Sequence, residues 1–394
     1  MPVLRALPLA AGPALAESFS SLVAMAAGAE CYLPVVDDPL APDRQLLESS
    51  LHVGSPVEVP DACLVIATSG STGEPKGAIH TPATLAASAD ATHARLGGPG
   101  NWLLALPPHH IGGLQVLLRA LRAGFTPAVA DLRDGFDAER FAADVALLRG
   151  PRRYTSLVPT QLVAVLASRA ATAAVADLDA VLVGGAATPP ALHDRARQAG
   201  IPIVRTYGMS ETGGGCVYDG RPLDGVSVTI GADDRVVLSG PMVARGYHRR
   251  PGDPAFAVPG SFRTDDVGRL DDGVLSVLGR ADDGISTGGL TVSPQVVEAV
   301  LAEDPAVAEC VVVGLPDERL GEQVVAAVVA SAGHTPDIEA LRRRVAQRVH
   351  RFAAPRRIVV RDSLPLRGSG KVDRRALRSL LADELSAQIG SPVD

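Results

Sequence analysis

Residues 67–77, ATSGSTGEPKG, follow directly on an apolar run at residues 62–66. A short apolar run that ends in hydroxyls and glycines is typical of a buried strand opening into an anion-binding loop. Glycines let backbone N–H groups approach a phosphate closely, and the hydroxyls and Lys76 supply further donors. The stretch therefore predicts a strand and a loop that hold a polyphosphate.

The spacing of this loop differs from that of the Walker loop, G-x-x-x-x-G-K-[ST], because Lys76 lies between Pro75 and Gly77. The loop thus indicates a different way of holding ATP. A flexible Ser/Gly segment is the alternative that such a composition usually indicates. The Pro-Lys-Gly ending after a buried strand favours the phosphate loop.

Beyond this loop, strand-sized apolar runs alternate with helical patterns. We expect strands at 102–106, 126–130, 154–158 and 180–183, and helices at 82–96, 114–122, 138–148 and 161–170. Such alternation indicates a parallel sheet covered on both faces, in which ligands bind beyond the carboxyl ends of the strands. Turns rich in Gly, Ser or His, at residues 70, 110, 184–185 and 208, are therefore expected to converge on one crevice.

The remaining patterns complete an expected α/β fold of two domains. Ahead of the loop we expect a strand at 3–9, a helix at 14–27 and a strand at 31–36. Short alternating runs at 226–277 predict a small antiparallel region. Beyond a boundary at 279–284, helices at 294–302 and 336–349 and strands at 306–313, 323–329 and 357–360 predict a compact α+β module. The predicted domains are residues 1–281 and 282–394.

The composition excludes several classes of function. A length of 394 residues fits two domains, and 46% hydrophobic residues with 3% aromatics indicate a globular protein with a core of Ala, Val and Leu. A net charge of −7 argues against a nucleic-acid partner. Four scattered cysteines fit neither a zinc spacing nor a disulfide framework, so a reducing cytoplasm is expected.

The N-terminus has two interpretations. A signal peptide is the alternative for residues 5–16, but a single Arg5 and the interruptions at Pro8, Gly12 and Pro13 favour a folded segment. No apolar run reaches the roughly 20 residues that a membrane span requires, so no membrane insertion is expected.

Several separated blocks resemble, in order, those of the acyl-adenylate-forming (AMP-binding) enzymes, which include acyl- and aryl-CoA ligases, adenylation domains of peptide synthetases and luciferases. The resemblance covers residues 60–394. The first block is similar to [ST]-S-G-[ST]-T-G-x-P-K-G, which implies that it binds the β- and γ-phosphates of ATP. The nucleotide-binding residues implied in this block are Thr68, Ser69, Gly70, Ser71, Thr72, Gly73 and Lys76.

Two further blocks are assigned to the acyl and adenine pockets by this resemblance. PHHIGG at 108–113 is similar to P-x-F-H-x-x-G, which places His110 at the acyl pocket as a catalytic and substrate-binding residue; a structural histidine is the alternative. GGA at 184–186 resembles the turn that lines adenine, with a plain turn as the alternative. The residues implied in this turn are Gly184, Gly185 and Ala186.

YGMSET at 207–212 matches the family's Y-G-x-[ST]-E-T. The match implies that Tyr207 stacks on adenine, that Gly208 belongs to the nucleotide site and that Ser210 contacts the α-phosphate. It also implies that Glu211 is a catalytic residue that binds Mg²⁺. A carboxylate beside phosphates needs such a cation, because Mg²⁺ is commonly held by one or two carboxylates together with substrate phosphates.

The C-terminal blocks are assigned to the ribose, the hinge and catalysis. TDDVG at 264–268 resembles T-G-D-x-G, which assigns the ribose-binding carboxylate to Asp266; Asp265 stands where Gly is usual, so the choice between the two stays open. GRAD at 279–282 places Arg280 near the ribose or phosphate and makes Asp282 the pivot between domains. The last block, PLRGSGK at 365–371, is similar to P-x-x-x-x-G-K, which implies that Lys371 is the catalytic lysine. The alternative is a solvated lysine, as most lysines near chain ends are.

The resemblance implies a ligase that uses ATP, Mg²⁺ and CoA and a small carboxylic acid, with a mobile C-terminal domain. The sequence does not define the oligomeric state, and a homodimer is one state it allows. Residues 207–225 look like the actinobacterial o-succinylbenzoate–CoA ligases of menaquinone synthesis. That dicarboxylate needs a second anion anchor, for which Arg119 is the candidate and a helix-surface arginine the alternative. An enzyme for another aryl or fatty acid, one that loads a carrier protein, and an inactive nucleotide-binding relative are the competing functions.

Overall fold

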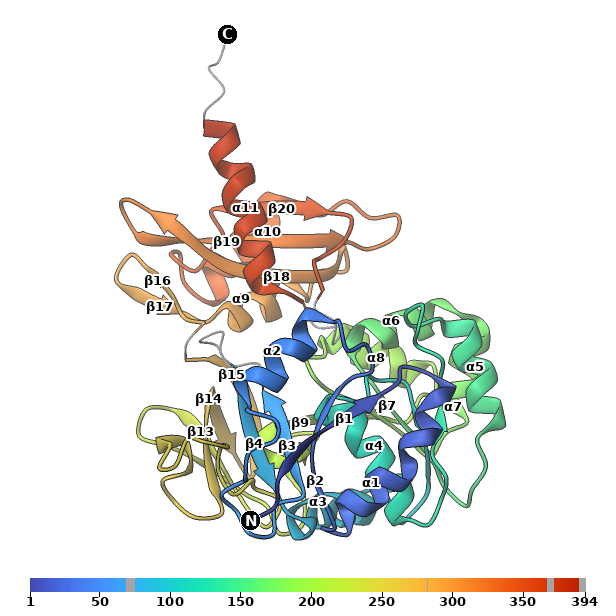
Figure 1. The fold of residues 1–394 in the computed structure, drawn as a ribbon. Coiled ribbons are helices and arrows are strands. Elements are labelled where there is room, and N and C mark those ends of the chain that lie inside the picture. The colour runs from blue at the N-terminus through green and yellow to red at the C-terminus, as the bar shows by residue number, and fades with distance from the viewer. Residues whose placement is uncertain (69–74, 282, 367–371, 390–394) are drawn as a thin grey trace. The chain divides into compact units, whose positions relative to one another are not determined.

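The structure is a computed structural model that describes residues 1–68, 75–281, 283–366 and 372–389. The chain divides into two compact units (Figure 1). The N-terminal unit comprises Met1–Thr188, Leu192–Thr264 and Arg269–Ser276, and the C-terminal unit comprises Pro189–Ala191, Asp265–Gly268 and Val277–Asp394. The predicted fold class, α/β with a large N-terminal and a small C-terminal domain, is confirmed. The predicted domain limits remain a prediction.

The first sheet of the N-terminal unit has the order β1-β2-β3-β4. Its strands are β1 (Leu4–Leu9), β2 (Cys31–Val36), β3 (Leu64–Thr68) and β4 (Lys76–His80). The first three are parallel, and β4 runs antiparallel to β3 with Thr68 opposite Lys76. The prediction of one loop over residues 67–77 is therefore wrong at both ends. Ala78 and Ile79 are buried and extend the apolar pattern into a second strand.

A seven-stranded sheet with the order β11-β10-β9-β8-β7-β5-β6 forms the centre of this unit. Its strands are β5 (Asn101–Leu104), β6 (Ala128–Val129), β7 (Arg153–Leu157), β8 (Ala180–Val183), β9 (Ile203–Met209), β10 (Gly214–Tyr218) and β11 (Arg221–Pro222). Strands β5 to β9 are parallel, whereas β10 is antiparallel to β9. Ala180 and Leu182 face one core cluster and Val181 and Val183 face another, so both faces are covered as predicted.

The helices of this unit lie close to the predicted positions, except those at 42–50, 169–176 and 190–198, which were not predicted. They are α1 (Phe19–Ala26), α2 (Pro42–Ser50), α3 (Pro82–Arg95), α4 (Ile111–Arg122), α5 (Ala138–Leu147), α6 (Pro159–Ala167), α7 (Arg169–Ala176) and α8 (Pro190–Gln198). The helices α5, α6 and α7 group together (Figure 1). Thr81 caps α3 by accepting a hydrogen bond from the Thr84 amide at 3.3 Å, and Pro82 occupies its first turn.

Two of the predicted helices are interrupted. The predicted helix at 14–27 is a 3₁₀ segment, Pro13–Ser18, followed by α1. The predicted helix at 161–170 breaks at Ser168, whose hydroxyl accepts a hydrogen bond from the Ala171 amide at 3.0 Å and caps α7. Serine competes with helix continuation in this way because its side chain satisfies an amide at a helix start.

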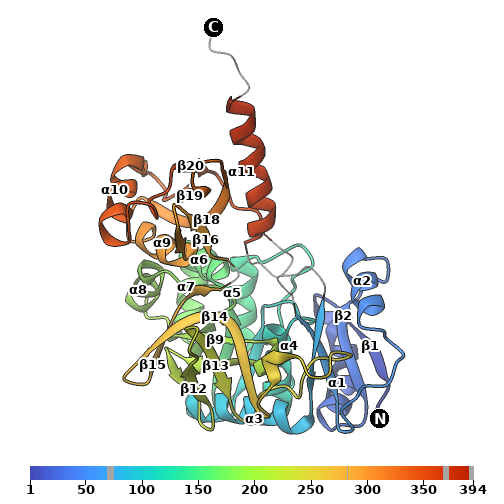
Figure 2. The same cartoon turned by 90° about the vertical axis from the view of Figure 1, so that its left-hand side faces the viewer.

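The predicted antiparallel region at 226–277 forms a sheet with the order β12-β13-β14-β15. Its strands are β12 (Ser227–Ile230), β13 (Arg235–Ser239), β14 (Ser261–Asp271) and β15 (Val274–Arg280). Strands β12 and β13 are antiparallel and lie side by side (Figure 2). Val228, Val236 and Leu238 pack into the core cluster that also contains residues of β10.

The C-terminal unit contains a separate sheet that is covered by helices. Its strands are β16 (Ile285–Thr287), β17 (Leu290–Val292), β18 (Val307–Asp317), β19 (Gly321–Ala330) and β20 (Arg357–Arg361), and its helices are α9 (Pro294–Leu301), α10 (Ile338–Arg348) and α11 (Arg374–Ile389). The order is β17-β16-β19-β18, with β20 parallel to β19. Val312 and Ala326 face α9 and α10, whereas neighbouring strand residues face α11. Helix α11 and the hairpin β16–β17 were not predicted.

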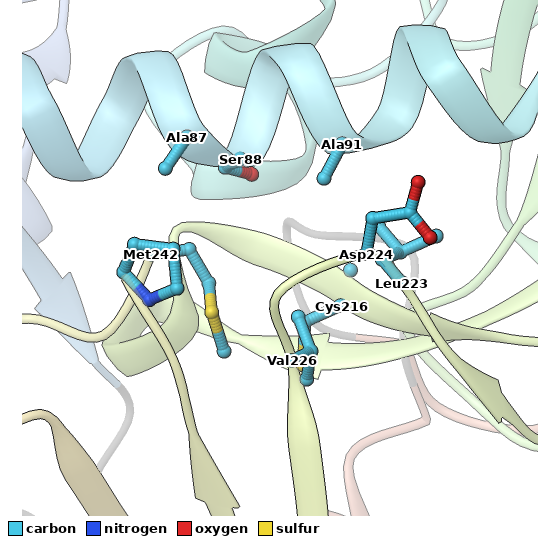
Figure 3. Close-up of a pocket in the computed structure, with 10 residues that line it drawn as sticks. Ala87, Ser88, Ala91, Cys216, Leu223, Asp224, Val226 and Met242 are labelled. Carbon is cyan, nitrogen blue, oxygen red and sulfur yellow. The ribbon is translucent and has the colours of Figure 1, made fainter.

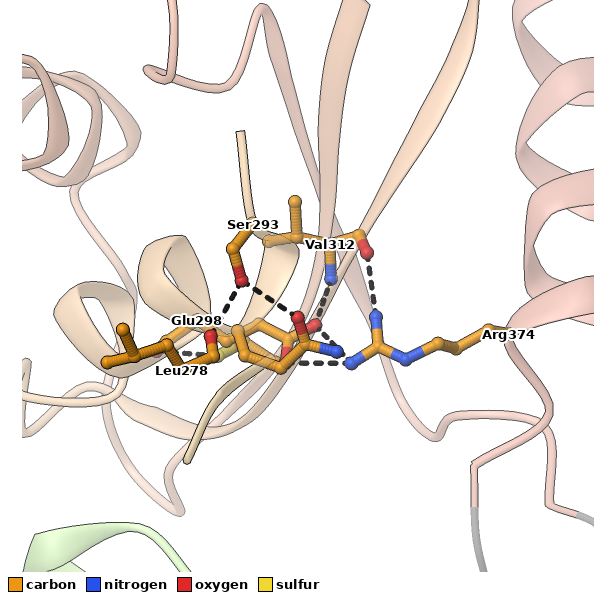
Figure 4. Close-up of polar contacts among 7 residues, drawn as sticks. Leu278, Ser293, Glu298, Val312 and Arg374 are labelled. Atoms are coloured by element: carbon orange, nitrogen blue, oxygen red, sulfur yellow. Dashed lines mark hydrogen bonds and ion pairs between the residues drawn. The ribbon is translucent and has the colours of Figure 1, made fainter. Parts of the chain in front are cut away.

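A largely buried ion pair joins α9, β18 and α11 within this unit (Figure 4). Arg374 lies 2.7 Å from the Glu298 carboxylate and donates a hydrogen bond to the Val312 carbonyl at 2.8 Å. The Glu298 carboxylate also accepts a hydrogen bond from the Val312 amide at 2.7 Å. Burial raises the pKa of Glu298, and the Arg374 charge and the Val312 N–H oppose that rise. The pair therefore connects α11 to the sheet, because Glu298 accepts from the Val312 N–H and Arg374 donates to the Val312 carbonyl.

Replacement of Glu298 by Ala is expected to destabilise the C-terminal unit by about 1.5–3 kcal/mol, because it leaves the partly exposed Arg374 guanidinium and the buried Val312 amide without their acceptor. Hydrogen exchange at the amides of β18 measures the loss. Trp102 fluorescence reports the N-terminal unit separately, since Trp102 is the sole tryptophan of the chain and is buried there. Glu384→Gln removes a more exposed pair with Arg361 and should cost under about 1 kcal/mol. Equal effects of the two changes would contradict the assignment.

Candidate active site

The turn Ser210–Thr212, a 3₁₀ segment between β9 and β10, presents Glu211. The Glu211 side chain is only 6% exposed. Its Oε1 accepts a hydrogen bond from the Tyr247 hydroxyl at 2.7 Å, and its carbonyl accepts one from the Ala244 amide at 2.9 Å. Both donors come from the segment that follows β13, so residues distant in the sequence hold Glu211, the predicted metal ligand, in place.

His80, at the end of β4, holds the same turn from another side. Its Nε2 lies 2.7 Å from the Ser210 carbonyl oxygen, and its Nδ1 lies 3.0 Å from Thr84 Oγ1. A carbonyl oxygen only accepts, so Nε2 carries the proton. Full burial lowers the pKa of His80 to about 4, which keeps the ring neutral at neutral pH. The sequence analysis missed His80; its position in the buried strand after Pro-Lys-Gly was the available signal.

Two helices hold the residue that ends the turn. Gly213 has a φ of 59° in the left-handed region, which glycine adopts without strain. Its carbonyl accepts hydrogen bonds from the Ser88 hydroxyl of α3 at 2.9 Å and from Nε2 of Gln115 of α4 at 2.7 Å. The Ser210 hydroxyl donates to the Ala67 carbonyl at 3.2 Å. The turn is thereby joined to the end of β3, where the predicted phosphate loop begins.

Lys76 lies at the other end of that loop, at the start of β4. Its ammonium is 3.6 Å from Asp253 Oδ2 and 4.7 Å from the centroid of the Tyr247 ring. Tyr247 therefore contacts both the predicted phosphate-binding lysine and the predicted metal ligand Glu211. The structure brings Lys76, Ser210 and Glu211 near one another, whereas the convergence of the turns at residues 70, 110, 184–185 and 208 remains a prediction. Asp253 and Tyr247 had not been predicted.

The predicted adenine-pocket glycines also have packing roles. A side chain at Gly184 would collide with Thr206 of β9, and one at Gly208 would collide with the Gly214 backbone of β10. Gly185 has a φ of 83°, and Ala186 is exposed. These contacts explain glycine at two of the positions without a ligand, so the adenine role remains a prediction.

His110 and Arg119 lie at opposite ends of α4. His110 precedes the helix as its N-cap residue, is exposed, and its ring centroid lies 4.4 Å from that of His109. Arg119 is buried, with 3% exposed, and its guanidinium lies 5.2 Å from the Trp102 ring. Burial lowers the pKa of Arg119, and its Nε has no hydrogen-bond partner among the described residues. The alternative of a helix-surface arginine is wrong.

A small pocket opens between α3 and β10 in the same unit (Figure 3). Ala87, Ser88 and Ala91 line it from the helix, and Cys216 and Met242 line it from the opposite wall. The small side chains of α3 leave this space, and Ser88 connects it to the Glu211 turn through its bond to Gly213.

The C-terminal unit holds the predicted ribose-binding residues. Arg280 lies 3.5 Å from the Asp265 carboxylate and 3.8 Å from that of Asp266. The Asp266 side chain is 15% exposed and that of Asp265 is 49% exposed. Both carboxylates thus adjoin Arg280, and the choice between them stays open.

Several predicted site residues lie outside the described residues: Ser69, Gly70, Ser71, Thr72, Gly73, Asp282 and Lys371. The residues that flank Lys371 are described. Leu366 and Val372 form a β-bridge, and the Asp373 amide donates to the Pro365 carbonyl at 2.7 Å. The two chain segments on either side of residues 367–371 are therefore held together.

The described residues contain no group of three or more His, Cys, Asp or Glu side chains that could hold a metal ion by themselves. Glu211 beside Lys76 and the start of the predicted phosphate loop fits Mg²⁺ instead, because this ion is commonly held by one or two carboxylates and the substrate phosphates. No helix within the described part of the chain is long and apolar enough to cross a membrane.

The fold and this arrangement define a nucleotide-dependent enzyme of the acyl-activating class. The AMP-binding enzyme family matches residues 22–248, and the AMP-binding enzyme C-terminal domain matches residues 296–371. The chain belongs to the AMP-binding enzyme family.

Relatives and solved structures agree with this assignment. A probable 2-succinylbenzoate–CoA ligase of Mycobacterium tuberculosis is 50% identical over 97% of this chain and 99% of its own length. A 2-succinylbenzoate–CoA ligase of Geobacillus kaustophilus is 32% identical over 85% of this chain and 73% of its own. The o-succinylbenzoate CoA synthetase of Bacillus subtilis, solved with its acyl-adenylate intermediate, has a TM-score of 0.77 and 25% identity over 96% of this chain and 88% of its own.

The buried His80 predicts acid sensitivity of the N-terminal unit. Its pKa is lowered from 6.5 to about 4, so on acidification the unfolded chain binds a proton before the folded chain does. Stability should therefore fall as the pH drops from about 6.5 to about 4, by about 3 kcal/mol from His80. Urea unfolding followed by Trp102 fluorescence measures this, and His80→Gln should flatten the dependence.

His93 adds to the same trend, because burial lowers its pKa to about 4 as well. His80→Gln is therefore expected to remove part of the pH dependence. His52→Gln, a change at an exposed histidine of the same unit, is the matched control and should leave the profile unchanged. An identical pH profile in wild type and His80→Gln would contradict the assignment of neutral His80.

Proposed function

We propose that this protein is an ATP-dependent ligase that adenylates o-succinylbenzoate and transfers the acyl group to CoA, a step of menaquinone biosynthesis. The observation that carries the substrate assignment is the 50% identity, over nearly the whole of both chains, to a relative named as a probable 2-succinylbenzoate–CoA ligase. Arg119, which is buried and whose Nε has no hydrogen-bond partner among the described residues, is the proposed anchor of the second carboxylate.

The first half-reaction needs no protein nucleophile. A carboxylate oxygen of the acid attacks the α-phosphorus of ATP, the bond to the bridging oxygen breaks, and pyrophosphate leaves with its electron pair. The family resemblance assigns the β- and γ-phosphates to residues 68–73 and Lys76, and it assigns the α-phosphate to Ser210 and Lys371. Mg²⁺, held by Glu211, supplies charge neutralisation on the phosphates. Fixed donors of this kind stabilise charge as it develops in the transition state.

The second half-reaction joins the acyl group to CoA. The thiol sulfur attacks the acyl carbon of the mixed anhydride, the bond to the phosphate oxygen breaks, and AMP leaves. His110 lies at the start of α4 and adjoins the acyl group in this proposal. Asp266 and Arg280 bind the ribose and phosphate of the nucleotide, and Asp282 is the hinge about which the C-terminal domain moves between the half-reactions.

The cytoplasm is the proposed compartment. All four cysteines are free, and Cys31, Cys63 and Cys216 are buried. Burial raises the pKa of Cys31 and Cys216 to about 12, so these thiols stay protonated and serve as small apolar side chains. ATP and CoA are supplied in the same compartment.

The proposed reaction is tested by incubation of the protein with o-succinylbenzoate, ATP, Mg²⁺ and CoA, followed by mass spectrometry. The expected product is the monothioester together with AMP and pyrophosphate. Lys371→Ala should abolish formation of the acyl-adenylate and spare thioester formation from supplied acyl-adenylate, because the lysine acts on the α-phosphate alone. Thioester from a panel of fatty or aryl acids, with none from o-succinylbenzoate, would overturn the substrate assignment.

Arg119→Met tests the second carboxylate anchor. Loss of a charge-assisted hydrogen bond costs about 1.5–3 kcal/mol, so kcat/KM for o-succinylbenzoate should fall about 10- to 100-fold. An analogue whose second carboxylate is replaced by a methyl group should lose little on the same change. Arg122→Met, three residues along α4 at an exposed position, is the matched control. Equal losses for the acid and the analogue would show that Arg119 acts through packing.

A further inference from the structure

The ion pair between Lys76 and Asp253, like the one between Arg374 and Glu298, joins two side chains that are mostly buried. Lys76 is 24% exposed and Asp253 is 14% exposed. The face of the Tyr247 ring covers the ammonium from a second side, and the Tyr247 hydroxyl reaches Glu211. Lys76 is thus enclosed beside the Glu211 turn, with a protein carboxylate as its charge partner.

The Asp253 carboxylate is held in place by the backbone. Its Oδ1 accepts a hydrogen bond from the Ala255 amide at 3.0 Å and caps the 3₁₀ turn Pro254–Phe256, and its Oδ2 faces Lys76. The turn is itself anchored, because the Phe256 ring packs edge-on against Tyr247 with centroids 5.0 Å apart. The negative charge cannot move far when another anion approaches Lys76.

We propose that Asp253 is the counter-ion of Lys76 in the absence of nucleotide, that the β- and γ-phosphates of ATP displace it, and that it thereby weakens binding of the triphosphate and of pyrophosphate. This inference rests on the proposed function, in which Lys76 binds those phosphates. An ammonium that gains a phosphate oxygen as ligand brings that oxygen close to the fixed carboxylate. Two anions then share one cation, and the repulsion between them opposes the bound state.

The same competition favours release of the leaving group. Pyrophosphate that departs from Lys76 exposes the ammonium in a mostly buried place, and Asp253 restores its charge partner at once. AMP and the acyl-adenylate lack β- and γ-phosphates, so the pair can persist while they are bound. Asp253 therefore acts selectively on ATP and pyrophosphate, and it leaves the affinity for AMP unchanged.

Asp253→Asn tests this inference, because the amide oxygen keeps the cap on Ala255 while the charge is lost. Calorimetric titration with a non-hydrolysable ATP analogue and Mg²⁺ should give binding about 2- to 5-fold tighter than wild type. Inhibition by pyrophosphate should strengthen by a similar factor, and the affinity for AMP should not change. Asp253→Ala should show the same gain, because it also removes the charge.

A matched control is Asp137→Asn, since Asp137 caps α5 through the Arg140 amide at 2.8 Å in the same unit. It should leave all three affinities unchanged. Binding of the ATP analogue that weakens in Asp253→Asn would overturn the inference and identify Asp253 as a residue that orients Lys76. A gain in Asp253→Ala alone would also overturn it and assign the effect to the 3₁₀ turn. Failure of the wild type to bind the analogue would instead refute the proposed function.

NMR of protein labelled with ¹⁵N-lysine gives a second readout. The chain contains two lysines, Lys76 and Lys371, so the Lys76 side-chain signal can be assigned with one variant, Lys371→Arg. Asp253→Asn should shift the Lys76 signal before any ligand is added, and the ATP analogue should shift it further in wild type. A Lys76 signal that does not respond to Asp253→Asn would contradict the ion pair.

Discussion

The hydrogen bonds that fix the Ser210–Thr212 turn are the constraint on which the rest of the site depends. His80 on β4 binds the Ser210 carbonyl, and Ser88 on α3 and Gln115 on α4 bind the carbonyl of Gly213, the residue after the turn. Tyr247, which comes from a segment beyond β13, adds the bond to the Glu211 carboxylate. The donors lie as far apart in the sequence as His80 and Tyr247, so the turn takes its geometry only when two sheets and two helices have packed. A displacement of about 1 Å at a reacting centre can lower the rate about 10²-fold, so a network that fixes the turn also protects the rate.

Lysine and arginine have different roles in this chain: arginines bind fixed protein partners, and the two lysines are assigned to phosphates. Almost all cations are arginines, and many of them bind carboxylates or backbone carbonyls in fixed geometries, as Arg374 does with Glu298 and Val312. Lysine occurs only at residues 76 and 371, the two positions that the family resemblance assigns to phosphates. An ammonium is a compact charge with freely rotating donors, and it can follow a phosphate that changes position during a reaction. A planar guanidinium suits a partner that stays fixed.

The strands and helices could be predicted well where the hydrophobic periodicity was strong. They were predicted poorly where a side-chain hydrogen bond or pairing with another strand determined the element's limits. Strands β2 and β8 and the capped start of α3 follow from local sequence. Strand β4 does not follow from local sequence, because the pattern of residues 67–77 predicts one continuous loop and gives no sign that β4 pairs with β3. The helix break at Ser168 depends on a single hydroxyl. Local propensity cannot rank such competing bonds.

The residues of the candidate site divide in the same way. Lys76, Ser210 and Glu211 stand in motifs, and the structure places them near one another. His80, Gln115, Tyr247 and Asp253 stand in no motif, because they act on the site through backbone carbonyls or through another side chain. Their signal is three-dimensional: a buried ring nitrogen against a carbonyl, or a carboxylate against an enclosed ammonium. Sequence reading finds groups that touch a ligand more readily than the groups that hold them.

Arg119 shows how burial couples the stability of the N-terminal unit to its proposed substrate. Removing a guanidinium from water costs several kcal/mol, and the Trp102 face returns only part of this. The acid proposed as substrate has two carboxylates, of which adenylation neutralises one. In the proposed reaction the other keeps its charge through both half-reactions, so an anchor at Arg119 would attract the acid, the acyl-adenylate and the transition states between them equally. Such uniform binding does not accelerate the chemical step. In the proposed reaction it would retain the reactive intermediate until CoA arrives, which is the requirement that a two-step ligase adds to ordinary catalysis.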